Sequence, residues 1–215
     1  MLNLNKKVLS NTLIWGLATG AVYEAFFRKF DQMILFWMQD QHFKALATFS
    51  RKIESILSSA HWIEFGLLCL IAFYVIGHTS KDPSKHPKLE KFRVKAGFIG
   101  FSLITTAILG TLLKYGLARY RPEMLLEKQL YGFHFFSMKD QNNSTPSGHT
   151  MLATAGFLSL DYLINKRWMS WILYFAIFVV GLSRIILSQH YTSDVFFGIY
   201  VGAICVYWVK CVREW

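Results

Sequence analysis

The feature that most constrains this chain is a series of six apolar segments, each close to the length of a transmembrane helix. The segments cover residues 8–27, 62–77, 96–114, 150–164, 168–187 and 195–209. Because a helix needs about 20 mostly apolar residues to cross a bilayer, we predict an all-α fold, a six-transmembrane helix bundle. The fourth and sixth segments are short for a span, so their ends are the least well defined.

The stretch between the first two predicted spans has a different pattern. Its apolar residues recur at helical spacing with charged residues between them: Ile34, Leu35, Met38, Phe43, Leu46, Phe49, Ile53, Ile56 and Leu57. This pattern is typical of amphipathic helices on a membrane surface, although a loop helix packed on the bundle explains it equally well. The chain has no internal repeat, so we expect residues 1–215 to form one integral-membrane domain.

Composition agrees with a membrane protein. Hydrophobic residues make up 53% of the chain and charged residues 17%, against about 25% charged residues in ordinary globular domains. The net charge of +10 suits nucleic acid, anionic lipid or phosphate, and the apolar composition argues against nucleic acid. Cys69, Cys205 and Cys211 lie in apolar stretches without ligand spacing, so we interpret them as packing residues rather than disulfides or a metal site.

The first polar cluster is the sequence KYGLARYRP, residues 114–122. Lys114 and Arg121 are seven residues apart, so on one helix that Pro122 then ends, both face the same side. An ammonium and a forked guanidinium on one stripe suit a phosphate, although basic residues that reach the membrane surface explain them too. Arg119 is expected to be an interfacial residue with a minor electrostatic role.

The second cluster is the sequence PSGH, residues 146–149, directly before an apolar segment. Proline and glycine favour a tight turn, whose backbone N–H groups and following helix N-terminus can receive an anion. Ser147 adds a hydroxyl donor, Gly148 a backbone N–H and His149 a titratable ring. Taken alone, this tetrapeptide is equally compatible with a simple helix cap.

The third cluster is SRIILSQHYTSD, residues 183–194, in which Asp194 follows His190 by four residues. A carboxylate at this spacing can accept the imidazole N–H and stabilise the imidazolium, which leaves the other ring nitrogen free to attack. A surface ion pair or helix cap would have the same spacing. Arg184 adds a third cation to those of the first cluster.

Topology brings the three clusters together. In a bundle of six spans, Lys114 ends the third helix, His149 begins the fourth, Arg184 ends the fifth and Asp194 begins the sixth. All four positions then lie on the same side of the membrane, for either orientation of the chain. Three unrelated surface features have no reason to converge in this way, so we predict one site.

These residues resemble the motifs of the type 2 phosphatidic acid phosphatase superfamily, and every motif position is present. The matching residues are Lys114, Arg121 and Pro122; Pro146, Ser147, Gly148 and His149; and Ser183, Arg184, His190 and Asp194. The resemblance implies a lipid phosphatase that uses a phosphohistidine intermediate and neither a metal nor another cofactor. His190 is then the nucleophile, Asp194 its activator and His149 the general acid, while Lys114, Arg121, Ser147, Gly148 and Arg184 bind the phosphate.

The resemblance leaves the substrate open. Lipid A 1-phosphate and undecaprenyl pyrophosphate are preferred, with phosphatidylglycerol phosphate and phosphatidic acid as alternatives. In the predicted 123–145 loop, Tyr131, Phe133, Phe135 and Phe136 form either a rim for lipid chains or a loop docked on the membrane, and His134 is interpreted as structural. The expected partners are the lipid phosphate and the bilayer, without nucleic acid or an obligate protein partner.

The basic residues of the short loops, counted without Lys114, Arg121 and Arg184, modestly favour termini on the inner side. The compact chain resembles bacterial members of the family, so we expect an inner-membrane enzyme with its site facing the periplasm. Three other functions remain as alternatives: a lipid phosphotransferase with a lipid pyrophosphate donor, a non-enzymatic lipid-binding protein, and a vanadate-dependent haloperoxidase. Six apolar spans argue against the haloperoxidase.

Overall fold

The computed structural model describes residues 6–41, 44–79 and 86–212, and within these ranges the chain is all-helical. The α-helices are α1 (Lys6–Ala25), α2 (Asp31–Asp40), α3 (Lys44–Ile56), α4 (Ser59–Thr79), α5 (Pro87–Leu117), α6 (Pro122–Lys128), α7 (Gly148–Ile164), α8 (Arg167–Ile186) and α9 (Thr192–Val212). A π-helical turn, Phe26–Phe30, joins α1 to α2, and a 3-10 turn spans Asp140–Asn142. The predicted all-α fold is therefore confirmed for these residues.

Four of the described helical stretches are long and apolar enough to cross a membrane. They are Lys44–Thr79, which contains α4, and the helices Pro87–Leu117, Arg167–Ile186 and Thr192–Val212. These stretches include the second, third, fifth and sixth predicted spans, as expected for a multi-pass membrane protein. The first and fourth predicted spans correspond to α1 and α7, and their crossing of the membrane stays a prediction.

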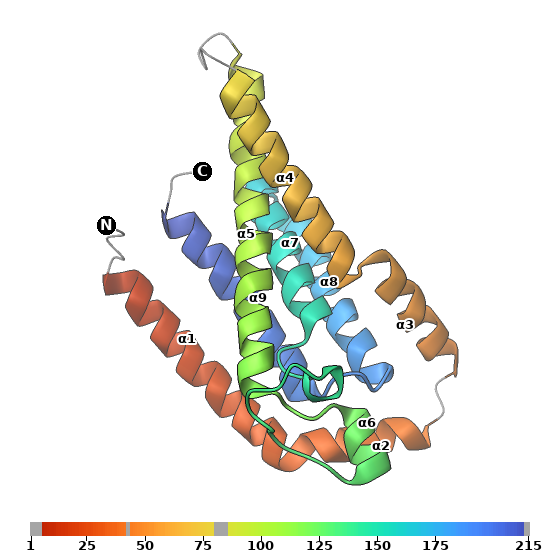
Figure 1. Cartoon of the computed structure of the whole chain (residues 1–215). Coiled ribbons are helices and arrows are strands. Elements are labelled where there is room, and N and C mark those ends of the chain that lie inside the picture. The colour runs from red at the N-terminus through yellow and green to blue at the C-terminus, as the bar shows by residue number, and fades with distance from the viewer. Residues whose placement is uncertain (1–5, 42–43, 80–85, 213–215) are drawn as a thin grey trace.

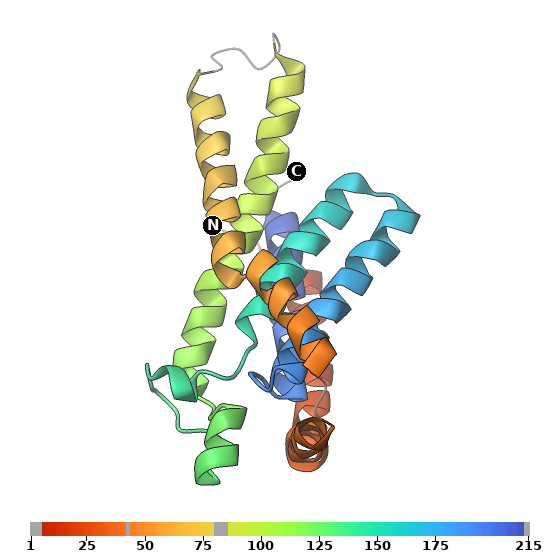
Figure 2. The ribbon, with the colours of Figure 1, turned by 90° about the vertical axis from the view of Figure 1, so that its right-hand side faces the viewer.

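Helices α5, α7 and α9 form the centre of the bundle, with α4 packed on α5, α8 on α7 and α1 on α9. Phe98, Leu103, Leu152, Val201 and Cys205 are all buried in the main apolar core between them. Figure 1 shows α2 and α6 lying across the end of the bundle where α5 stops, and Figure 2 shows the α4–α5 and α7–α8 pairs diverging from the common core. The three central helices thus bring distant parts of the chain to one end.

Close contact between α7 and α9 depends on glycine. A Cβ atom on Gly202 would lie 2.4 Å from the Met151 carbonyl oxygen, and one on Gly198 would lie 3.0 Å from the Ser147 carbonyl oxygen. Both neighbours are backbone atoms, which cannot move aside as a side chain can. These two glycines, at the middle of α9 and about one turn before it, therefore allow α9 to approach the beginning of α7 closely.

The connection after α5 differs from the prediction. Lys114 and Arg121 do not share a helix, because α5 ends at Leu117 and Ala118 adopts a left-handed conformation (φ 45°). Pro122 does not end that helix but begins α6, where its missing N–H costs no hydrogen bond and its fixed φ suits the first helical turn. Arg121 therefore stands at a turn, where its direction is independent of the face of α5.

The helices predicted between the first two spans are present as α2 and α3, which pack on neighbouring parts of the bundle. Their position at a membrane surface stays a prediction. The three cysteines differ in burial: Cys205 is buried, Cys69 is partly buried and Cys211 is exposed. All three are free thiols. The interpretation of Cys211 as a packing residue is wrong, because its position near the end of α9 faces outward.

Candidate active site

A cavity of about 260 Å³ lies where α5 ends and α7 begins. Its lining residues are Ser59, Thr111, Lys114, Tyr115, Arg121, Asp140, Asn143, Gly148, His149, Arg184, Gln189 and His190. Six of the eight predicted site residues are in this set. The other two, Ser147 and Asp194, are buried and do not line the cavity. The structure therefore brings residues of the three sequence clusters together around one cavity.

Three cations reach the cavity, each held by oxygen atoms. Lys114 Nζ donates a hydrogen bond to the Asn143 carbonyl at 2.8 Å. Arg121 binds the carbonyl and the carboxylate of Asp140, both at 2.9 Å. Arg184 lies 2.9 Å from a carboxylate oxygen of Glu54 and also donates to the Gln189 side chain. This arrangement suits a dianionic group that would take over some of these contacts.

His190 is oriented by a backbone carbonyl. Its Nδ1 lies 2.7 Å from the carbonyl oxygen of Ser144, and a carbonyl only accepts, so Nδ1 carries the proton. The other ring nitrogen, Nε2, then has a free lone pair. Burial lowers the pKa of His190 to about 3, with nearby Asp194 acting in the opposite direction. The ring is therefore neutral near pH 7, which is the state that the predicted nucleophilic role of His190 requires.

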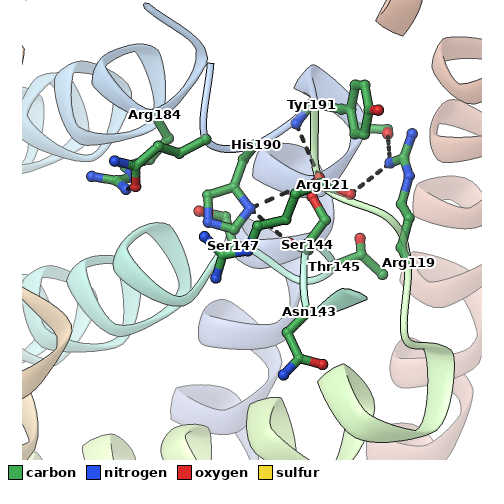
Figure 3. A network of polar contacts seen from close by, with 12 residues as sticks. Arg119, Arg121, Asn143, Ser144, Thr145, Ser147, Arg184, His190 and Tyr191 are labelled. Atoms are coloured by element: carbon green, nitrogen blue, oxygen red, sulfur yellow. Dashed lines mark hydrogen bonds and ion pairs between the residues drawn. The ribbon is translucent and has the colours of Figure 1, made fainter. Parts of the chain in front are cut away.

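Asp194 acts on His190 less directly than predicted. Its carboxylate lies 3.8 Å from His190 Nδ1, beyond hydrogen-bonding distance, and one of its oxygens accepts the Ser144 hydroxyl at 2.6 Å. The same oxygen accepts the Tyr191 N–H at 3.0 Å. The prediction that Asp194 accepts the imidazole N–H is therefore corrected: Asp194 fixes Ser144, whose carbonyl fixes the ring. Figure 3 shows His190, Ser144, Tyr191 and Arg119 close together, with their polar contacts as dashed lines.

Arg119 is the largest departure from the prediction. It is not an exposed residue with a minor role but fully buried, and its guanidinium pairs with Asp194 at 2.6 Å and with Asp31 at 2.8 Å. It also donates to the hydroxyls of Ser193 and Tyr131, at 2.6 and 3.0 Å. Burial acts to lower the pKa of Arg119, but Asp194 and the other neighbours outweigh it and raise the pKa above its ordinary value.

The PSGH turn contributes to the cavity in part. His149 and Gly148 line it, at the first residues of α7. Ser147 is fully buried; its hydroxyl accepts a hydrogen bond from Thr150 at 3.0 Å, and its N–H donates to the Asp194 carbonyl at 3.1 Å. Ser147 therefore joins the beginnings of α7 and α9, and the structure does not bring it to the cavity surface as predicted.

The four aromatic residues of the predicted rim differ in their exposure. Tyr131 is not at a rim but packs at Arg119, and Phe133 stacks on Phe27 with ring centres 5.4 Å apart. Phe135 and Phe136 remain outward, with 54% and 91% of their surfaces exposed. Two of the four aromatic residues are therefore half-buried against neighbouring segments, and the other two are exposed.

Among the residues that the structure describes, no three His, Cys, Asp or Glu side chains gather in a way that would hold a metal ion. The cavity instead presents the side chains of Lys114, Arg121 and Arg184. Metal independence stays a prediction, which a chelator tests.

The amino-acid sequence is similar to those of two bacterial lipid phosphatases. The chain is 30% identical over 106 residues to a lipid A 1-phosphatase of Rhizobium johnstonii, and 28% identical over 141 residues to a lipid A 1-phosphatase of Rhizobium etli. These matches cover 49% and 63% of this chain, but only 43% and 60% of the relatives' own lengths.

A solved structure has the same fold. It is a transmembrane PAP2-type phosphatidylglycerolphosphate phosphatase from Bacillus subtilis, with a TM-score of 0.64 and 20% identity, covering 96% of this chain and 95% of its own. The model of the PAP2 superfamily matches residues 95–215, which is more than half of the chain and includes every motif residue named above. The chain therefore belongs to the PAP2 superfamily.

Proposed function

We propose that this protein is a metal-independent lipid phosphatase that hydrolyses a phosphate monoester or pyrophosphate of an envelope lipid through a phosphohistidine. The observation that carries the proposal is the meeting of two histidines and three cationic side chains in one cavity at the ends of apolar helices. The Nδ1 proton of one of these histidines is held by a carbonyl. A lipid-binding protein without activity needs the cations but has no use for an oriented nucleophile.

In the first step, Nε2 of His190 attacks phosphorus and the bond from phosphorus to the leaving-group oxygen breaks. His149 donates a proton to that oxygen, so the lipid or lipid phosphate departs in a protonated form. Burial lowers the pKa of His149 to about 4, and the negative charge of a bound phosphate acts to raise it. Lys114, Arg121 and Arg184 bind the three remaining phosphoryl oxygens and stabilise the charge that builds there, with help from the Gly148 N–H.

In the second step, water attacks the phosphohistidine. His149, deprotonated by the first step, accepts a proton from the water, and the phosphorus–nitrogen bond breaks to regenerate His190. Inorganic phosphate is then released. A phosphotransferase shares the first step but passes the phosphoryl group to a lipid hydroxyl or phosphate, so the fate of the phosphoryl group separates the two activities.

Lipid A 1-phosphate and undecaprenyl pyrophosphate are the preferred substrates, and the names of the two relatives favour the first. Phosphatidylglycerol phosphate and phosphatidic acid remain as alternatives. A site at the ends of the helices lies at headgroup depth, so a lipid can reach it with its chains in the bilayer. Phe135 and Phe136, both exposed, are placed to contact those chains.

The decisive experiment measures phosphate release by the purified protein from a panel of lipid phosphates and pyrophosphates. We expect the wild type to release phosphate from at least one, and His190→Ala to abolish release while remaining folded. His134→Ala is the matched control, since the exposed His134 ring contacts Tyr120 and does not line the cavity. Loss of activity with EDTA and recovery with Mg²⁺ would contradict the metal-free mechanism.

Six membrane crossings, with the site facing the periplasm of a bacterial inner membrane, complete the proposal. Cysteine labelling in intact cells tests the orientation in a variant that lacks the three native cysteines. Met138 and Lys88 are suitable positions, because both are exposed and they lie at opposite ends of α5. An impermeant reagent should label Met138→Cys and leave Lys88→Cys unmodified; the reverse pattern would overturn the orientation.

A further inference from the structure

Asp31, the first residue of α2, lies in a part of the chain that the family model does not match. It is nevertheless fully buried beside the site. One carboxylate oxygen lies 2.8 Å from Arg119, and the other accepts the Ser193 N–H at 3.0 Å. The Ser193 hydroxyl also donates to Asp31. Asp31 thus binds both the arginine behind the site and the beginning of α9.

A continuous series of polar contacts leads from Asp31 to the nucleophile. Arg119 binds Asp31 through one terminal nitrogen and Asp194 through the other, the latter at 2.6 Å. Asp194 accepts the Ser144 hydroxyl at 2.6 Å, and the Ser144 carbonyl accepts Nδ1 of His190 at 2.7 Å. The ion pairs of Arg119 with both aspartates are entirely buried.

The charges of this series have a consequence for the reaction. Asp31, Arg119 and Asp194 together carry one net negative charge when all three are ionised. His190 becomes positively charged when it attacks phosphorus, and a nearby net negative charge stabilises that change. Without Asp31, the charge of Arg119 would cancel that of Asp194, and these residues would no longer offset the positive charges of Lys114 and Arg184 near His190.

Arg119 is also fixed in place by aromatic rings. Its guanidinium carbon lies 4.1 Å from the ring centre of Tyr191 and 4.9 Å from that of Phe27. These rings attract the guanidinium and help to hold it beside both aspartates. Its net effect on Asp194 therefore depends on the negative charge of Asp31.

We propose that Asp31 is a positioning residue for phosphoryl transfer: acting through Arg119, it holds Asp194 in place and keeps the charge of Asp194 available to His190. The proposal rests on the proposed function, since it assigns Asp31 a part in the same reaction. It also means that the segment before the family-matched region completes the site.

The test compares Asp31→Asn with the wild type, per folded molecule, for kcat, KM and inhibition by inorganic phosphate. Asparagine keeps the size and one acceptor but removes the charge. We expect kcat to fall about 10- to 100-fold, while KM and the inhibition constant for phosphate change less than about twofold, because Lys114, Arg121 and Arg184 are untouched. The control is Glu90→Gln, which breaks an ion pair with Arg93 at the far end of α5.

A double variant separates this role from a merely structural one. When Asp194 is already replaced by asparagine, adding Asp31→Asn should lower kcat by less than about a further twofold, because the effect of Asp31 passes through Asp194.

If Asp31→Asn does not fold, Ser193→Ala is the deciding variant. It removes a hydroxyl that lies between Asp31 and Arg119 and leaves every charge in place. We expect kcat to fall about threefold, with unchanged inhibition by phosphate.

Three results would overturn the role of Asp31. The first is an unchanged kcat in Asp31→Asn, or in Ser193→Ala if Asp31→Asn does not fold. The others are a weakening of phosphate inhibition in proportion to the loss of kcat, and losses of kcat that multiply in the double variant. A wild type that releases no phosphate from any lipid would instead contradict the proposed function. The two failures are therefore distinct.

Discussion

Arg119 and Arg121 are two residues apart, yet they lie in opposite environments. Arg119 has no exposed side-chain surface and pairs with two buried carboxylates. The side chain of Arg121 is 22% exposed, lines the cavity, and pairs with Asp140, whose own side chain is 88% exposed. The same functional group therefore serves two purposes: one guanidinium is committed to the framework and the other remains available to a ligand.

The contrast extends to two regions of the site. A buried framework of Asp31, Arg119, Ser144 and Asp194 orients His190 on the side of the ring that carries Nδ1. The cavity in front of His190 holds cations whose present partners are carbonyl, amide and carboxylate oxygens. The proposed reaction, in which His190 attacks the phosphate of a mobile lipid, needs both properties: fixed orientation for the attacking atom and exchangeable contacts for the phosphate.

Replacing each arginine by alanine tests the contrast most strongly. Arg119→Ala leaves two buried carboxylates without a cation, and breaking a buried pair in this way costs about 3–5 kcal/mol of stability. Arg121→Ala removes an exposed pair, so its stability should change by less than about 1 kcal/mol, while its KM for the lipid phosphate rises. Thermal unfolding in detergent and phosphate release measure the two effects.

Arg121→Lys is the control for the second variant, because it keeps the charge and loses only the forked geometry. If Arg119→Ala and Arg121→Ala proved equally stable, the assignment of Arg119 to a buried framework would be wrong.

The difference between the two arginines also marks the limit of sequence reasoning. Apolar length predicted the helices, and the shared membrane side of Lys114, His149, Arg184 and Asp194 predicted one site, because both follow from local pattern and from topology. The motif spacing selected Arg121. Nothing in that spacing distinguishes Arg119, whose burial depends on contacts with distant segments.

Asp31 and Ser144 show the same limit in different ways. Asp31 meets Arg119 across 88 residues of sequence, so no local pattern could pair them. Ser144 orients His190 through its backbone carbonyl, an atom that every residue possesses and that composition cannot reveal. The four-residue spacing of His190 and Asp194 suggested direct contact, but the turn between α8 and α9 holds them 3.8 Å apart.

The framework should also be sensitive to the packing that carries it. Gly202→Ala would place a methyl group 2.4 Å from the Met151 carbonyl oxygen between α9 and α7, and such overpacking typically costs about 1–3 kcal/mol. We expect a lower unfolding temperature and reduced kcat, because both helices begin at the site. Gly20→Ala in α1 is the matched control: apart from its chain neighbours and the backbone of its own helix, no heavy atom lies within 4 Å of the new Cβ, so a stability equal to or above that of the wild type is expected.

The neutral state of His190 predicts a dependence of stability on pH. Burial lowers the pKa of His190 from 6.5 to about 3 in the folded protein, so between these values the unfolded chain binds a proton that the folded chain does not. Stability therefore falls as the pH is lowered through 6.5, by about 2 kcal/mol at pH 5 from this group alone. His190→Asn should lack this contribution. Parallel curves of unfolding temperature against pH for the wild type and His190→Asn would show that the ring is not held neutral by burial.

The smallest expected effect concerns the ion pair between Arg121 and Asp140 at the cavity. Asp140→Asn removes the carboxylate that pairs with Arg121 at 2.9 Å, and an exposed pair of this kind is worth about 0.2–1 kcal/mol. Arg121 then becomes easier to transfer to a phosphate, so KM should fall by up to about fivefold, with kcat and unfolding temperature almost unchanged. The effect should shrink as ionic strength rises, because the pair is open to solvent.

Glu123→Gln, which removes an exposed acid two residues from Arg121 at the start of α6, controls for the general loss of negative charge. An equal fall in KM for both variants would mean that net charge near the cavity, and not release of Arg121, sets the affinity.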